Sequence, residues 1–303
     1  MILIALLIAL AGHSKDSFPK IKCSVKTQIP AGSENRKKFV SEISEYAKAE
    51  GYNDEELKNF EKALRRYLKD PRINRSYCKS LLNIVSPKLI SKQNEAHETS
   101  YQRLMTPEMM KAAKDFKKKY RTALKRAAEK HKIDANVVVS ILAWESNFGK
   151  NMGKYFVANV FLTQILFIDK ANKKVLPKIS SQKDFNLTDY QNRLKRIENR
   201  AKANFVALLI ESEKRKMDAL SVRGSWAGAI GIPQFMPASL KWADTNRKGS
   251  VVNLLNMSDA IFSVANYLRE HDFAADPFKA VFAYNNDSAY AEGVLKLAKS
   301  LAI

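Results

Sequence analysis

The sequence has little cysteine, glycine and proline for its length, and few acidic residues for its number of basic ones. Only 10 glycines and 9 prolines occur among 303 residues, which excludes a collagen-like or low-complexity chain. No cluster of cysteine and histidine has the spacing of a zinc site. The longest apolar run, Ile2–Ala11, is half of the ~20 residues that a membrane-spanning helix needs. With 46% hydrophobic residues, the chain has enough apolar material for one large or two small folded domains.

The apolar run at the N-terminus is typical of a secretory signal. It ends in the small-x-small triplet Ala9-Leu10-Ala11, and polar sequence follows at once. We therefore expect residues 1–11 to be a signal peptide and residues 12–33, which contain two prolines, to be a linker. No Lys or Arg precedes the run, which points to a start codon further upstream. The alternative is a buried N-terminal helix.

The two cysteines, Cys23 and Cys78, are compatible with two states. In an exported protein they would form one disulfide that ties the N-terminal segment to the helices after it. Otherwise they would be two free thiols, and the sequence does not distinguish these states.

The balance of charge is strongly basic, since 52 Lys and Arg against 31 Asp and Glu give a formal net charge of +21. Basic residues concentrate at Lys111–Lys132, Lys170–Lys178 and Arg193–Lys202. Such charge attracts a polyanion, although each stretch alone also fits a solvated helix face. Because no RNA-binding aromatic motif, KH loop or zinc finger occurs, we do not expect a nucleic-acid partner. For an exported chain we expect the anion to be a cell-wall polymer or an anionic membrane surface.

Capping residues and the helical spacing of apolar residues predict a mainly α fold. Ser33, Asn53 and Thr106 are each positioned as N-caps, and Asn53 forms a capping box with Glu56. Four predicted helices run from Ser33 to Gly51, from Asn53 to Asp70, from Thr106 to about Lys132 and from Ser288 to about Ala302, the third as one long basic helix. Two more are predicted to begin at Asp134 and at Ser258. At most a small hairpin, within Leu162–Leu187, is expected besides these helices.

The segment Asp134–Gly149 carries the clearest sign of chemistry. Glu145 lies seven residues after Val138 on a helix face that is otherwise apolar. Gly149 is suited to end this helix, which places Glu145 in the last turn, at the negative end of the helix dipole. Apolar surroundings and the dipole both raise a carboxyl pKa. We therefore expect Glu145 to be protonated near neutral pH, as a general acid must be, the alternative being a solvent-facing glutamate at a frayed helix end.

A second segment, Gly224–Leu240, combines glycines with neutral polar and aromatic residues. Its glycines permit a ligand to approach the backbone closely. Ser225 and Gln234 offer neutral hydrogen-bonding groups, and two aromatic rings offer flat apolar faces. This mixture suits a sugar, although most glycine-containing loops are plain structural turns. A third segment, Ala283–Asn286 with Tyr290 after it, adds polar aromatic residues before the last predicted helix.

These segments, in this order, resemble the lytic murein transglycosylase B family. The shared motifs are Glu-Ser-x-Phe-Gly at Glu145–Gly149, the Gly-Ser-aromatic-Ala-Gly block at Gly224–Pro237, the Asp-Ala-Ile block at Asp259–Leu268, and Tyr284-Asn285. The resemblance extends from about Phe39 to the end of the sequence. It implies one transglycosylase domain over residues 34–303, with an N-terminal helical part, 34–105, and a lysozyme-like catalytic core, 106–303.

The resemblance also implies roles for single residues. Glu145 matches the one catalytic acid and base of the family. Arg200 matches, less closely, an arginine that meets the peptide stem of the substrate. Five further positions match cleft residues that hold the acid or position the sugar: Ser225, Gln234, Tyr284, Asn285 and Tyr290.

The activity that the resemblance implies is cleavage, without water, of the β-1,4 bond between N-acetylmuramic acid and N-acetylglucosamine in peptidoglycan, which leaves 1,6-anhydromuramic acid ends. It requires no cofactor and no metal. Some family members bind calcium in an EF-hand-like loop, but here Lys248 takes the fifth position and Leu255 the twelfth, so we expect little or no calcium at Asp244–Gly249. We further expect a periplasmic monomer that binds peptidoglycan glycan strands.

Three other functions stay open on the residues alone. A muramidase that uses water would need a second carboxylate facing Glu145. Asp287 is one candidate for it, whereas Asp259 looks like a helix-start residue. The other two alternatives are a wall-binding protein without turnover and a nucleic-acid binder argued from charge alone.

Overall fold

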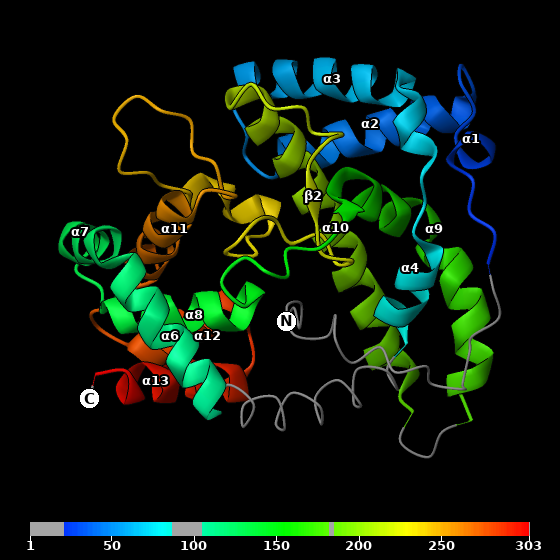
Figure 1. The fold of residues 1–303 in the computed structure, drawn as a ribbon. Coiled ribbons are helices and arrows are strands. Elements are labelled where there is room, and N and C mark those ends of the chain that lie inside the picture. The colour runs from blue at the N-terminus through cyan, green and yellow to red at the C-terminus, as the bar shows by residue number, and fades with distance from the viewer. Residues whose placement is uncertain (1–20, 87–104, 182–184, 303) are drawn as a thin grey trace.

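The computed structural model describes residues 21–86, 105–181 and 185–302, whose helices form two lobes (Figure 1). The first lobe contains α1 (Val25–Gln28), α2 (Glu34–Ala49), α3 (Asp54–Lys69), the 3-10 helix η2 (Pro71–Asn74), α4 (Cys78–Val85), α9 (Val157–Ile179) and α10 (Leu187–Lys214). The second lobe contains α6 (Pro107–Lys119), α7 (Arg121–His131), α8 (Ala135–Ser146), α11 (Met257–Glu270), α12 (Pro277–Tyr284) and α13 (Ser288–Ser300). The lobes are connected by the strands β1 (Tyr155–Phe156) and β2 (Arg223–Gly224) and by the 3-10 helix η3 (Pro237–Trp242).

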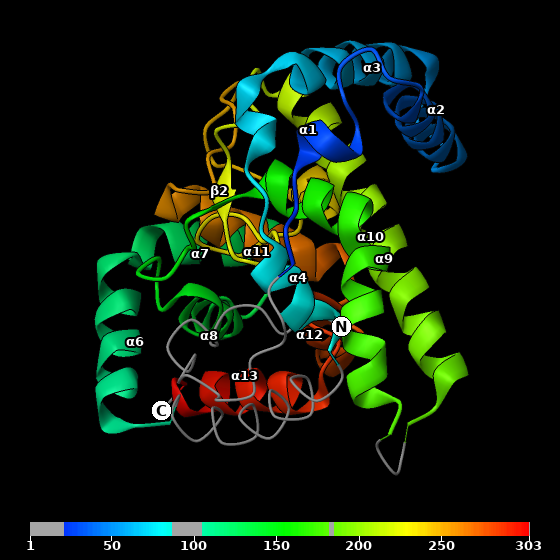
Figure 2. The same cartoon turned by 90° about the vertical axis from the view of Figure 1, so that its right-hand side faces the viewer.

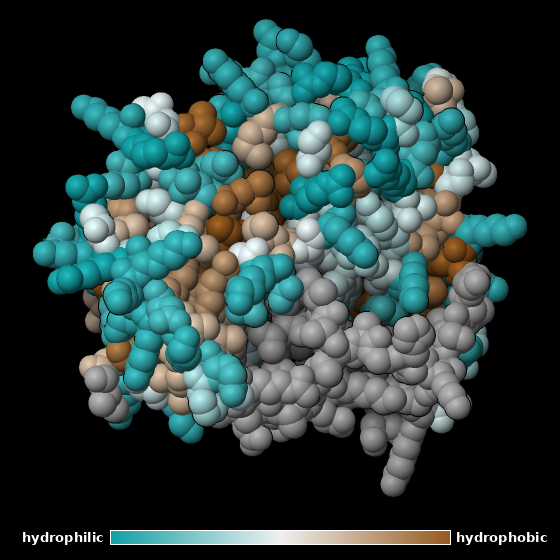
Figure 3. Space-filling view, in the orientation of Figure 1, coloured by the Kyte–Doolittle hydropathy of each residue, from teal (hydrophilic) through white to brown (hydrophobic). Residues whose placement is uncertain are grey.

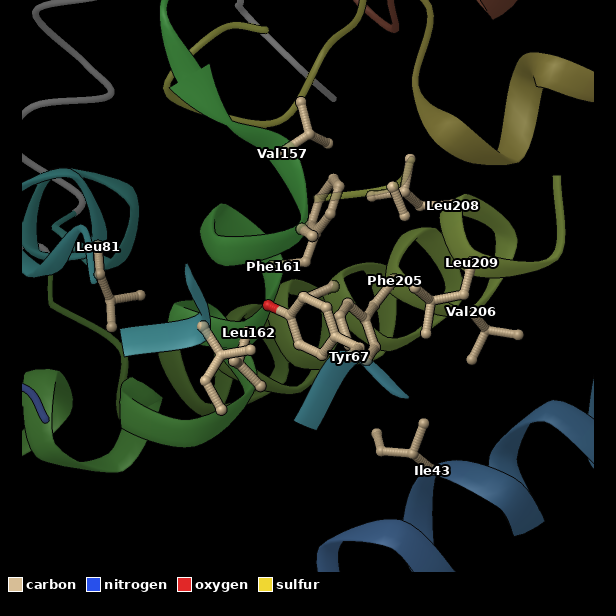
Figure 4. Packing of buried hydrophobic residues seen from close by; sticks show 14 of the residues in the cluster. Ile43, Tyr67, Leu81, Val157, Phe161, Leu162, Phe205, Val206, Leu208 and Leu209 are labelled. Atoms are coloured by element: carbon tan, nitrogen blue, oxygen red, sulfur yellow. The ribbon is translucent and has the colours of Figure 1, made fainter. Parts of the chain in front are cut away.

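Each lobe has its own hydrophobic core. In the first lobe α9 and α10 pack side by side (Figure 2), and α2, α3 and α4 pack against this pair. Figure 4 shows the centre of this core, where Tyr67 meets Phe205 edge to face with ring centroids 5.5 Å apart. In the second lobe α8 packs against α6, α11 and α13. The strands and the 3-10 helix η3 between the lobes are therefore flanked by a packed core on each side.

The expectation of a mainly α fold is confirmed. Among the described residues, the named strands are β1 and β2, which pair antiparallel with Tyr155 opposite Gly224 and Phe156 opposite Arg223. None of the helices in the described ranges combines the length and the apolar composition needed to cross a membrane. The face seen in Figure 3 is mainly hydrophilic, and hydrophobic residues gather near its middle.

Four of the predicted helix starts are confirmed by their capping contacts. Ser33, Thr106 and Asp134 each accept a backbone N–H of the first turn of α2, α6 and α8, respectively. Asn53 and Glu56 form the expected reciprocal capping box at the start of α3. These starts were predictable because a cap depends on residues within one turn of each other.

The hairpin suggested within Leu162–Leu187 is wrong. Residue 162 lies inside α9, which continues to Ile179, and the strand pair forms elsewhere, from Tyr155–Phe156 and Arg223–Gly224. The first half of α9 is buried on nearly all sides, between α10 and α4. A helix buried all round lacks the one-sided apolar pattern by which a sequence indicates a helix.

The single long helix expected from Thr106 to about Lys132 is also wrong. The chain leaves helical geometry at Tyr120, where α6 ends and α7 begins. The Tyr120 ring lies 4.7 Å from that of Phe116, which in turn stacks at 4.5 Å on Phe148, just beyond α8. The break lets α6 pack on α8 while α7 packs on α11, so tertiary contacts decide it.

The expected linker over residues 12–33 is folded from residue 21 onward. Val25 and Ile29 are buried in the first lobe, and Cys23 forms a disulfide with Cys78 at the start of α4. The bond selects one of the two states that the sequence left open, and it holds the segment against the helices. The expected signal peptide, residues 1–11, lies outside the described residues.

Candidate active site

Glu145 occupies the last turn of α8, as predicted, and is 6% exposed. The helix ends at Asn147, which takes the left-handed conformation with φ 48° and donates its N–H to the carbonyl of Ala143. The sequence favoured Gly149 for this role, but asparagine also tolerates that conformation. Glu145 therefore points its carboxyl group into the protein at the point where the chain turns away towards β1.

The carboxyl group of Glu145 has a hydrogen bond to one tyrosine. Tyr290, in the first turn of α13, donates its hydroxyl to Glu145 Oε1 at 2.8 Å and is itself fully buried. Burial raises the pKa of Glu145 to about 8, and the hydrogen bond from Tyr290 opposes this rise in part. A carboxyl group with such a pKa is mostly protonated at neutral pH, as a general acid must be.

Two more tyrosines, Tyr284 and Tyr267, lie close to Glu145 and Tyr290. Burial and the charge of Glu145 both raise the pKa of Tyr284 well above its ordinary value. Tyr284 donates its hydroxyl to the carbonyl of Pro233 at 2.6 Å, which ties the end of α12 to the glycine-containing segment. Its ring packs edge to face on Tyr267, with centroids 4.8 Å apart. Sequence reasoning did not select Tyr267 as a site residue, although it lies inside the Asp259–Leu268 block.

The segment Gly224–Pro237 forms a tight turn around Ser225. The Ser225 hydroxyl is fully buried and accepts the N–H groups of Ala227 and Ala229 at 3.3 and 3.0 Å. At Gly228, which has φ 99°, an added Cβ would lie 2.2 Å from an atom of the Phe161 ring, so only glycine fits there. The contacts of Ser225 are thus those of a residue that shapes the turn, and its role toward a sugar stays a prediction.

Gln234 and Asn285 each keep a buried oxygen without a partner. The side-chain N–H of Gln234 donates a hydrogen bond to the carbonyl of Gly231 at 2.7 Å, while its Oε1 is buried and accepts no hydrogen bond. Asn285 is the C-cap of α12, and its Oδ1 is likewise buried and accepts no hydrogen bond. Leaving such an acceptor unpaired costs about 1–3 kcal/mol, so both oxygens are suited to accept a hydrogen bond from a ligand. The roles of Gln234 and Asn285 toward a sugar stay predictions.

Arg200 lies on α10, in the first lobe. Burial and the nearby charge of Arg193 lower the pKa of its guanidinium group to about 10. Its carbonyl accepts the side-chain amide of Asn204, whose oxygen in turn accepts the N–H of Ala238 in η3. These contacts connect its helix to the glycine-containing segment, but its role toward a peptide stem stays a prediction.

No second carboxylate acts on Glu145 in the part of the chain that the structure describes, since burial and Tyr290 alone account for its shifted pKa. Asp287 is the N-cap of α13 and accepts the backbone N–H of Tyr290. Asp259 is fully buried, and its oxygens accept from Thr245, Arg247 and the N–H of Asn253. In a glycosidase of the two-carboxylate type the second carboxylate stays free to act on the sugar or on a water, whereas both of these aspartates already accept hydrogen bonds from the protein.

Comparison with known proteins gives a consistent result. A family described as "Transglycosylase SLT domain" matches residues 35–277. The membrane-bound lytic murein transglycosylase B of Escherichia coli K12 is 28% identical over 182 residues, which are 60% of this chain and 43% of that protein. The chain thus spans less than half the length of this curated relative.

Solved structures share the fold. The lytic transglycosylase SLT35 of Escherichia coli, solved in complex with calcium, superposes with a TM-score of 0.61 at 19% identity, over 90% of this chain and 94% of that one. SltB3 of Pseudomonas aeruginosa, solved with NAG-anhNAM-pentapeptide, has a TM-score of 0.57 at 17% identity, over 88% of this chain and 79% of that one. This likeness confirms the expected fold class, mainly α with a lysozyme-like catalytic core.

The SLT35 structure holds calcium, and in this chain the loop with a calcium-loop pattern is Asp244–Gly249. The Asp244 carboxylate contacts Lys130 and His131, with His131 Nε2 at 2.8 Å from Oδ2. Asp259 contacts Arg247. Among the described residues, no three side chains of His, Cys, Asp or Glu gather in a group that could hold a metal ion. Because both carboxylates already hold cationic side chains, the donor set does not fit calcium, which requires several free oxygen ligands.

Proposed function

The chain belongs to the transglycosylase SLT family, and from this we propose that it is a lytic transglycosylase. In this proposal it cleaves the β-1,4 bond between N-acetylmuramic acid and N-acetylglucosamine in peptidoglycan and leaves 1,6-anhydromuramic acid ends. The observation that supports it most directly is Glu145, a buried carboxyl group with a pKa of about 8 and a tyrosine as its hydrogen-bond partner.

In the first step protonated Glu145 donates its proton to the glycosidic oxygen, and the bond from that oxygen to the anomeric carbon of the muramic acid breaks. The N-acetyl group of the sugar assists at the anomeric carbon. Tyr290 then acts as a positioning residue, because its hydroxyl donates to the carboxylate that this step produces.

In the second step the carboxylate of Glu145 takes the proton of the muramic C6 hydroxyl. The C6 oxygen bonds to the anomeric carbon within the same ring, which restores the protonated acid. An attack within one molecule has an effective molarity of up to ~10⁵–10⁸ M, so one acid and base suffices. This mechanism agrees with the pKa of Glu145, to which no second carboxylate contributes among the described residues.

We also propose a location in the cell envelope, in the periplasm. Two observations support this location: the Cys23–Cys78 disulfide, a bond that persists in oxidising compartments, and the apolar N-terminal run of the sequence. The formal charge of +21 would speed the capture of anionic peptidoglycan, an effect that salt weakens. Glycan strands are the proposed partner, and a monomeric state stays a prediction.

The test is a digest of purified peptidoglycan with the chain and with its E145Q variant, read by the masses of the released muropeptides. We expect products one water lighter than those of a muramidase, and only from the unmodified chain. Fully hydrated products would indicate the muramidase alternative. If neither the chain nor its E145Q variant releases products while both bind the wall, the chain is a binding protein that lacks turnover.

A further inference from the structure

Three groups of one loop converge on the buried carboxylate of Asp259. This residue lies in the first turn of α11, and its side chain is 1% exposed. One carboxylate oxygen accepts the hydroxyl of Thr245 at 2.6 Å. The other accepts the N–H of Asn253 at 2.8 Å and a guanidinium N–H of Arg247. The first and the last part of loop 244–256, which leads from η3 into α11 (Figure 1), are therefore held by the same carboxylate.

The charges of this loop are arranged in the opposite way to those of a calcium loop. A calcium loop surrounds a cation with oxygen ligands, whereas here the loop surrounds a carboxylate of α11 with hydrogen-bond donors. The positive charge beside that carboxylate is the guanidinium group of Arg247, whose side chain is 52% exposed. The carboxylate of Asp244, at the start of the loop, contacts Lys130 of α7. Two cationic side chains of the chain itself thus stand where a calcium loop has its ion.

Loop 244–256 also packs directly against the turn that carries Gln234. Ile232 donates its N–H to the carbonyl of Leu254 at 2.9 Å. At Gly231, which has φ 70°, an added Cβ would lie 2.6 Å from the Cβ of Leu254. The carbonyl of Gly231 accepts both the backbone N–H of Gln234, at 3.2 Å, and its side-chain N–H, at 2.7 Å. The position of Leu254 therefore bears on the turn from which Gln234 presents its buried Oε1.

We propose that Arg247 does in this chain what a bound cation does in a calcium loop. Its ion pair with Asp259 holds loop 244–256 in place and, through Leu254, positions the turn that carries Gln234. A guanidinium group stays charged at any pH at which the protein is folded, and it belongs to the chain, so the loop keeps its place whatever the calcium concentration. The positioning of Gln234 rests on the proposed function, whereas the holding of the loop does not.

The first experiment follows amide hydrogen exchange at Ile232 and Asn253, because each of these amides donates one of the hydrogen bonds of the loop. We expect R247Q to speed exchange at both amides about tenfold, the lower range for loss of a hydrogen bond to a charged group, and to leave exchange in the first lobe unchanged. R247K keeps the charge without the planar fork and should give a smaller increase. Arg65→Gln, which removes an exposed ion pair with Glu61 on α3, is the matched control and should alter neither amide.

Calcium provides the opposing arm of this experiment. Adding calcium or a chelator to the unmodified chain should leave exchange at Ile232 and Asn253 unchanged, because Arg247 already supplies the positive charge. Slower exchange with calcium would overturn the inference, since an ion would then hold the loop. Unchanged exchange in R247Q, once circular dichroism shows the variant to be folded, would overturn it as well.

The second experiment tests the positioning of Gln234 by the kinetics of glycan cleavage. R247E places two carboxylates face to face, and such like-charge contacts cost several kcal/mol, so KM should rise at least about tenfold. The rise should follow the order Lys, Gln, Glu at this position, with a smaller change in kcat, because Glu145 lies outside the loop. Faster exchange with KM and kcat unchanged in all three variants would overturn the positioning. If the unmodified chain cleaves no glycan, the proposed function fails instead, and the exchange data still decide whether Arg247 holds the loop.

Discussion

Replacing Glu145 with Gln should stabilise the folded protein at neutral and alkaline pH and leave its stability nearly unchanged in acid. Burial raises the pKa of this carboxyl from an ordinary value of 4.5 to about 8. Between these two pH values the folded protein holds a proton that the unfolded chain has lost. The free energy of unfolding therefore falls as the pH rises through this window. A glutamine cannot ionise, so the variant does not undergo this loss.

The magnitude follows from the size of the pKa difference. Each pH unit within the window changes the stability difference by about 1.4 kcal/mol. Over the roughly 3.5 units between the two pKa values the variant gains about 5 kcal/mol by pH 8, and about 3 kcal/mol at pH 7. Both figures exceed the about 0.5 kcal/mol within which most surface substitutions fall.

The assay is urea unfolding of both proteins at intervals from pH 5 to pH 9, followed by tryptophan fluorescence. Trp144 is buried next to Glu145 and reports on this part of the core. The matched control is Glu129→Gln, an exposed carboxyl group on α7 of the same lobe. The reasoning would be refuted if the stability difference between E145Q and the unmodified protein stayed constant over this range. A constant difference would mean that the pKa of Glu145 is the same in the folded and the unfolded protein.

The remaining predictions concern the tyrosine, the disulfide and the acidic loop. Tyr290→Phe removes a hydrogen bond that favours the ionised acid, so the alkaline limb of the pH–rate profile should move up from about pH 8 by about one unit while kcat falls; an unmoved limb would contradict this. Replacing Cys23 and Cys78 with Ser opens a loop of 55 residues and should lower the free energy of unfolding by about 4 kcal/mol, measured by denaturant titration against the unmodified, oxidised protein; an equal midpoint would count against it. R247Q removes one donor from a fully buried carboxylate and should cost about 1–3 kcal/mol, whereas calcium or a chelator should leave the Tm of the unmodified protein in place. A rise in that Tm with calcium would show that the loop accepts the ion.

The parts of the fold that the sequence predicted well depend on neighbours in the chain. The caps at Ser33, Asn53, Thr106 and Asp134 act within one turn, and each is present. The apolar pattern of α8 placed Glu145 correctly on a buried face in the last turn. Such features are local, so they can be read without knowledge of which helices meet.

The parts that were mispredicted depend on contacts between distant segments. The break at Tyr120 serves the packing of α6 on α8 and of α7 on α11. The first half of α9 is buried nearly all round, so its sequence lacks a one-sided pattern. The fold of the segment around Val25 follows from its place in the first lobe and from the disulfide.

By itself, the sequence determined the mainly α architecture, the helix that carries Glu145, and the set of motifs that indicated the family. Only the tertiary structure decided the chemical state of the acid, because its pKa depends on burial by both α8 and its neighbours and on Tyr290, which lies 145 residues further along the chain. The same holds for the contact of Leu254 with the turn that carries Gln234. Helical periodicity and capping act over a few residues, whereas desolvation and charge act through space, between residues that only the packed fold brings together.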